Sequence, residues 1–140
     1  MKENIINIEK WTGFFHDGGI ISINHYDKII DLMIESAELN PTWNEDNIPL
    51  SKYKTIRGVL HFKKVKSIKS NHKLIEKLKM ISDECEILRL KIQKNKVTLL
   101  VQWMNYPPKN REFFTEFIEI EAEKIYFENE PDLIDPLDIE

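Results

Sequence analysis

The feature that most constrains this fold is an alternation of apolar residues with period two, repeated in several separate segments. Ile30, Leu32 and Ile34 alternate with a set that includes Asp31 and Glu35. Successive side chains of a strand point to opposite faces, whereas a helix would repeat its apolar residues every three or four positions. The pattern therefore predicts strands that each present one face to a common core.

Six extended elements follow from this period. Residues 20–36 are expected to form a hairpin that turns at 25–28, with Ile21 and Ile23 on one face of its first strand. A second hairpin is expected from 86–93 through a tight turn at Lys94–Asn95 into 97–104. Its core-facing residues would be Leu88, Leu90, Ile92, Val97, Leu99, Val101 and Trp103. The last strand, 113–127, would bury Ile118, Ile120 and Ala122.

The remaining element, 55–68, is a long strand with a change of register. Ile56, Gly58, Leu60 and Phe62 share one face, but after Lys63–Lys64 the apolar position moves to Val65. A slip of one residue would turn every later side chain over, so a β-bulge near Lys64 is predicted. The segment 40–51 has two prolines and three asparagines and is interpreted as a loop.

Only one segment favours a helix. In residues 71–82 an apolar stripe recurs at helical spacing, and Ser70 or Asn71 could cap it. The stripe consists of Leu74, Ile75, Leu78 and Ile81. The fold class expected for the 140 residues is thus mainly β, a single antiparallel β-sandwich or strongly curved sheet of about six strands, with one short helix near 71–82. Residues 1–128 would form the domain and 129–140 an acidic, proline-containing tail.

Charge is distributed very unevenly along the chain, although the net charge is only −4. Residues 51–80 hold ten basic residues and one acid, and residues 112–140 hold eleven acids and one lysine. Two interpretations stand side by side: an acidic surface for a partner, or charges that pair across neighbouring strands. The near-neutral total argues against nucleic acid as the partner of the basic stretch.

The stretch FFHDGGII raises the question of a catalytic or metal-binding pair at His16 and Asp17. Adjacent side chains of an extended segment point to opposite faces, and no histidine of the chain stands in HxH or HExxH spacing. A turn is favoured instead, opened by Asp17, with positive φ at Gly18 and Gly19. Trp11, Phe14 and Phe15 would anchor it in the core. No catalytic residue, metal or cofactor is assigned. The alternative is a small enzyme or ligand-binding β protein with a site around His16, Asp17 and His61.

The single cysteine, Cys85, excludes an internal disulfide and a CxxC metal knuckle. Its neighbours Glu84 and Glu86 oppose thiolate formation, so a buried and inert thiol is expected. No secretory leader or membrane-spanning apolar run is recognised, and the composition is typical of a soluble, cytoplasmic bacterial protein. No GxSxG, GxxxxGK[ST] or GxGxxG motif occurs.

Trp11 followed by Phe15-His16-Asp17 and an Ile-Ile strand resembles the opening of small bacterial immunity-type proteins, which are encoded beside polymorphic toxins. The segments GVLHF (58–62) and NYPPK (105–109) also resemble those of small bacterial β proteins. The resemblance implies a non-enzymatic, stoichiometric binder of a protein partner. It transfers no binding residues, and His16 and Asp17 would be framework.

The expected function is therefore a non-catalytic protein-binding module, and in its more specific form an immunity protein that neutralises a toxin. An acidic surface would attract a basic toxin, because charge complementarity accelerates association and selects partners. The predicted partner-binding residues are Glu119, Glu121, Glu123, Glu128, Glu130 and Asp132. Homodimerisation through an exposed strand edge is a further possibility.

Overall fold

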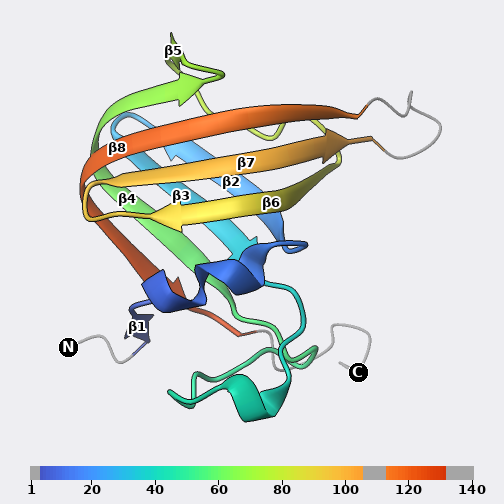
Figure 1. The fold of residues 1–140 in the computed structure, drawn as a ribbon. Coiled ribbons are helices and arrows are strands. Elements are labelled where there is room, and N and C mark those ends of the chain that lie inside the picture. The colour runs from blue at the N-terminus through green and yellow to red at the C-terminus, as the bar shows by residue number, and fades with distance from the viewer. Residues whose placement is uncertain (1–3, 106–112, 132–140) are drawn as a thin grey trace, which may run out of the picture.

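A computed structural model describes residues 4–105 and 113–131, which form a closed β-barrel. Eight antiparallel strands make one sheet in the order β1-β8-β7-β6-β2-β3-β4-β5, and β8 also pairs with β4 (Figure 1). That extra pairing closes six strands into the barrel and leaves β1 and β5 outside the closed ring. The strands are β1 (Ile5–Ile6), β2 (Gly19–Tyr26), β3 (Ile29–Glu35), β4 (Arg57–Ser70), β5 (Lys73–Ile75), β6 (Glu84–Ile92), β7 (Lys96–Met104) and β8 (Phe114–Asn129). The expected strongly curved, mainly β sheet is confirmed.

Closure depends on the length and curvature of β8. Its first half pairs with β7, from Phe114 opposite Trp103 to Glu121 opposite Lys96. The pairing with β4 reaches from Ile118 to Asn129, so the strand passes from one neighbour to the other as it bends (Figure 1). The acidic last strand consequently lies directly beside the basic long strand.

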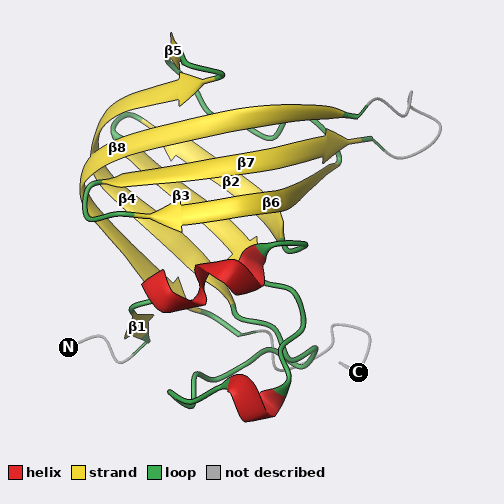
Figure 2. Cartoon of the chain, in the orientation of Figure 1, coloured by secondary structure: helices red, strands yellow, loops and turns green. Residues whose placement is uncertain are grey.

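The core fills the interior of the barrel, as the alternation predicts. Ile30, Leu32, Ile34, Val97, Leu99, Val101, Trp103, Ile118, Ile120 and Ala122 are all buried. A 3₁₀-helix, η1 (Glu9–Phe15), crosses one end of the barrel (Figure 2) and inserts Trp11 and Phe15 into that core. A second, η2 (Pro41–Trp43), stands in the segment interpreted as a loop. Most of the buried residues among those described belong to strands, and the two 3₁₀-helices are seven and three residues long.

Three bulges shift the faces of the strands. A register shift between Ile20 and Ser22 leaves the Ile21 residue 44% exposed, so the predicted pairing of Ile21 with Ile23 on one face is wrong. Another register shift lies between Ile87 and Arg89. It places Cys85, Ile87 and Leu90 in the core, so the prediction that Leu88 shares a face with Leu90 is wrong. The predicted bulge in β4 is present: Lys64 has a φ of 53°, and the register with β8 shifts between Val65 and Ser67.

The helix predicted for 71–82 is absent from the structure. Asn71 and His72 both have positive φ and turn the chain into β5, where Lys73 pairs with Ser70. The apolar stripe does not share one face, because Leu78 is buried whereas Leu74 is 73% exposed. A turn-forming pair of residues and the open edge of β4 outweighed a weak helical period.

The two predicted hairpins are confirmed. Asp27, with a φ of 53°, turns β2 into β3, and the Gln93 N–H donates to the Lys96 carbonyl across the Lys94–Asn95 turn. The predicted tail begins as the end of β8 at Asn129, and its residues 132–140 lie outside the described part. In the described ranges no helix combines the length and apolar character needed to cross a membrane.

Candidate functional site

The FFHDGGII stretch is a turn between η1 and β2, as expected, but its glycines act differently from the prediction. Asp17 takes the positive φ, 71°, and no glycine does. Gly18 is required for close approach instead: a Cβ there would stand 2.1 Å from the Glu35 carbonyl oxygen. The turn is tied to β6, because the Asp17 N–H donates to the Ile87 carbonyl and the Ile87 N–H donates to the Gly18 carbonyl.

His16 and His61 do not share a site. The exposed His16 ring has Nδ1 2.6 Å from the Leu88 carbonyl oxygen and Nε2 3.7 Å from Asp17 Oδ1. His61 lies on the outer face of β4 with other partners, and none of five hollows formed by the described residues is lined by either histidine. The residues of the alternative site are therefore not brought together around one cavity.

His61 is held between two carboxylates on neighbouring strands. Its Nδ1 is 2.7 Å from Asp31 Oδ1 on β3, and its Nε2 is 2.9 Å from Glu128 Oε1 on β8. Its ring also stacks on Tyr126 at 4.7 Å between centroids. Both ring nitrogens of His61 therefore already have a carboxylate partner. This cluster links three strands across the outside of the barrel.

Two of the six predicted partner-binding acids pair with lysines of neighbouring strands. Lys96 Nζ is 2.9 Å from Glu119 Oε2, and this hydrogen bond holds the pKa of the Glu119 carboxyl below its ordinary value. Lys64 lies 3.5 Å from Glu123. Of the other predicted partner-binding residues, Glu121 is exposed, Glu128 bonds His61 and Asn4, Glu130 donates its N–H to the Arg57 carbonyl, and Asp132 lies outside the described residues. Charge pairing between neighbouring strands therefore occurs at Glu119 and Glu123, and the binding of a partner to the acidic surface stays a prediction.

A different surface stands out at the end of the barrel that η1 crosses. Trp43, 53% exposed, stacks on Phe14 at 5.9 Å between ring centroids, and Phe14 meets the buried Trp11 at 5.6 Å. We call Trp11, Phe14 and Trp43 the aromatic row. It continues the core outward to the surface and ends on an exposed indole.

Polar contacts fix the aromatic row in place. The Asn40 side chain caps η2 by accepting from the Thr42 N–H, which orients the backbone of Trp43. On the other side, Lys10 Nζ is 2.8 Å from Asp46 Oδ2, and the Trp11 indole N–H donates to the same oxygen at 3.3 Å. The hydrogen bond from Lys10 lowers the pKa of the Asp46 carboxyl, and that from Trp11 acts in the same direction.

Two hollows flank Trp43. One, of about 200 Å³, lies toward Lys10, Trp11, Phe14 and Glu45. The other, of about 460 Å³, is lined by Glu38, Leu39, Asn40, Pro41 and Lys54. An exposed tryptophan held by a second ring, with a hollow on each side, is a surface into which a partner can fit.

The barrel interior holds one polar cluster near Cys85. The Trp103 indole N–H donates to Glu116 Oε1 at 2.8 Å, and the Ser70 hydroxyl donates to Oε2. Burial, and next the charge of Glu116, raise the pKa of the Cys85 thiol to about 12. The expected buried thiol is confirmed, but its pKa is raised by burial and Glu116 and not by the flanking glutamates that the sequence suggested.

Sequence reasoning missed the aromatic row, although one signal was present: Trp43 is a large aromatic residue in a polar, proline-containing loop. No protein-family model, curated protein or solved structure matches this chain.

Proposed function

We propose that this protein is a non-catalytic module that binds a protein partner through the aromatic row and its two flanking hollows. The observation that carries the proposal is Trp43, which is half-exposed yet fixed by stacking on Phe14. Tryptophan is enriched among the residues that dominate binding energy in protein interfaces. A side chain fixed before binding loses little conformational entropy on association.

The more specific form of the proposal is an immunity protein that neutralises a basic toxin. That form relied on the acids of β8, whose charge is reduced locally by Lys96 and Lys64. The aromatic row gives the proposal a surface that does not depend on net charge. Salt would then weaken the complex only modestly, because contacts between apolar groups are not screened.

Co-purification from the source cells tests the proposal. We expect the tagged full chain to retain one protein in stoichiometric amount and Trp43→Ala to lose it. Tyr26→Ala is the matched control, since Tyr26 ends β2 and is 58% exposed. The β2–β3 turn lies far from the segment 41–43 (Figure 1). Equal retention by both variants, or no stoichiometric partner for the wild type, would contradict the proposal.

A further inference from the structure

A window opens in the barrel wall beside β8. The pairing with β7 ends at Glu121, and β1 takes up the same edge of β8 only at Phe127. Asn95 bridges the first part of this interval, because its carbonyl accepts from the Ala122 N–H and its side-chain amide donates to the carbonyls of Ala122 and Glu123. Within the described ranges no strand pairs with that edge at Lys124, Ile125 and Tyr126.

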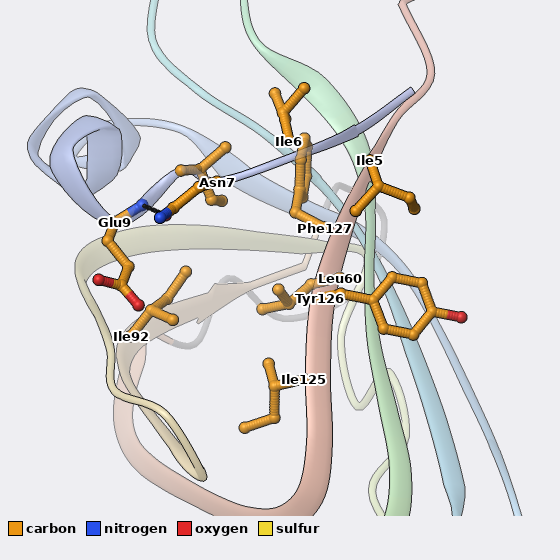
Figure 3. A pocket seen from close by; sticks show the side chains of 10 residues that line it. Ile5, Ile6, Asn7, Glu9, Leu60, Ile92, Ile125, Tyr126 and Phe127 are labelled. Carbon is orange, nitrogen blue, oxygen red and sulfur yellow. Dashed lines mark hydrogen bonds between the residues drawn. The ribbon is translucent and has the colours of Figure 1, made fainter. Parts of the chain in front are cut away.

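A cavity of about 300 Å³, lined by apolar side chains together with Asn7, Glu9 and Tyr126, lies behind this edge. Its lining is Ile5, Ile6, Asn7, Ile8, Glu9, Leu60, Ile92, Ile125, Tyr126 and Phe127 (Figure 3). Ile125 and Ile92 point into it, and the Tyr126 ring points away from it (Figure 3). The volume is at the lower end of the range for ligand pockets and suits a single large apolar side chain better than an extended small molecule.

The course of β1 explains why the window exists. Ile5 opposes Glu128 and Ile6 opposes Phe127, so a longer β1 would continue along Tyr126, Ile125 and Lys124. The chain leaves the edge instead, because the Glu9 N–H donates to Asn7 Oδ1 and η1 begins at Glu9. β1 is a two-residue strand that stops where the cavity starts.

We infer that an extended segment of a partner protein binds here by strand addition, antiparallel to β8 and in line with β1. Unpaired strand edges accept added strands, and alternate side chains of the added strand set its specificity. The segment would need about three residues, since the open interval measures roughly 10 Å at the rise of a strand. This site is separate from the aromatic row and does not depend on it.

The side chains of the window define the sequence that fits. The residue opposite Ile125 would enter the cavity and should be isoleucine, leucine or valine. Tyr126, with Lys124 Nζ 5.2 Å from its ring centroid, faces outward. A β-branched residue opposite Tyr126 and an acid opposite Lys124 are the favourable cross-strand pairs. Read from N to C, the segment is therefore a β-branched residue, an aliphatic residue and an acid.

The test uses the full chain labelled with ¹⁵N and the peptide acetyl-Lys-Thr-Val-Ile-Glu-Lys-amide. We expect saturable amide shifts at Asn95 and at Ile125 and Tyr126. Neighbouring residues of a strand direct their N–H groups to opposite edges, so only one of the two residues, the isoleucine or the glutamate, donates its N–H to β8. The peptide N-methylated at that residue should bind about tenfold more weakly, because the methyl group removes a backbone hydrogen bond. Ile125→Trp, which fills the cavity, should abolish binding, whereas Ile21→Trp on the exposed part of β2 should not.

A charge exchange keeps the inference testable if Ile125→Trp fails to fold. Lys124 is exposed, so Lys124→Glu should fold normally and weaken this peptide about threefold, and a peptide with lysine in place of glutamate should recover the loss. No shift at the window, equal binding by both N-methylated peptides, or shifts there from 8-anilinonaphthalene-1-sulfonate but from no peptide would overturn strand addition.

Discussion

Gly18→Ala is expected to be among the most destabilising single-methyl additions in this protein. The new Cβ would stand 2.1 Å from the Glu35 carbonyl oxygen, where ordinary contact begins at 3.4 Å, and would also crowd the Phe15 carbonyl oxygen at 3.0 Å. Both neighbours are backbone atoms, so relief requires separating the ends of β2 and β3. Overpacking of this kind costs about 1–3 kcal/mol, and loss of one of the turn's hydrogen bonds adds about 1 kcal/mol. We expect a total of about 3 kcal/mol, a large part of a typical domain stability.

Urea unfolding followed by tryptophan fluorescence measures this change in the free energy of unfolding. Gly13→Ala is the matched control, because a Cβ at Gly13 in η1 meets nothing within 4 Å and its φ is not positive. It should be neutral or stabilise the protein by up to about 1 kcal/mol. The reasoning would be refuted if Gly18→Ala cost less than about 1 kcal/mol or if the two variants behaved alike.

Three further predictions concern buried and paired groups. Glu116→Gln keeps one carbonyl acceptor but turns an amide N–H toward the other donor, either Trp103 or Ser70. Thermal or urea unfolding should therefore show a free energy of unfolding lower by about 1–3 kcal/mol. Unchanged stability would contradict the hydrogen bonds of this cluster. Cys85, with its pKa raised to about 12, should carry about a thousandfold less thiolate than an ordinary thiol, so a disulfide reagent at pH 8 should label it rapidly only after unfolding; fast labelling of the native protein would count against its burial. The pKa of Glu119 is lowered by Lys96, so the stability that this pair contributes is present above the ordinary Glu pKa and is lost as the pH falls through the lowered folded pKa. Lys96→Met should flatten that part of the stability–pH curve, and parallel curves for the two proteins would exclude the linkage.

The strands could be predicted from sequence wherever burial alternates without interruption. Val97 to Trp103 and Ile30 to Ile34 follow the period because each lies in a regular stretch of the barrel wall. The faces of β2 and β6 could not be assigned in full, because a bulge adds one residue and exchanges inside for outside. The residues added at the two bulges, Ile21 and Leu88, are themselves apolar, so neither bulge interrupts the apolar pattern of the sequence.

The false helix and the missed surface share one cause, which is contact between residues distant in sequence. The segment 71–82 has a helical spacing of apolar residues, but β4 offers an edge for pairing and Asn71 turns the chain back onto it. The aromatic row joins Trp11 and Phe14 of η1 to Trp43 of η2. Neither the edge nor the row is visible until the chain is folded.

The pairing of charges shows what the sequence could foresee. The opposite charges of residues 51–80 and 112–140 allowed pairing across strands, and β4 and β8 prove to be neighbours over most of their length. Whether the two stretches could meet depended on strand order, since the order β8-β7-β6-β2-β3-β4 brings β8 and β4 together only by closing the barrel. The alternation alone does not determine closure.

Binding of a protein partner at the aromatic row is tested most sharply by covalent capture in the source cells with Trp43 left in place. A photoactivatable benzoylphenylalanine replaces Glu45, an exposed residue that lines the hollow beside Trp43, in one variant and the exposed Tyr26 in another. We expect one discrete crosslinked protein from position 45 and none of that mass from position 26. The same product from both positions, or none from position 45 in a folded variant, would refute binding at the aromatic row.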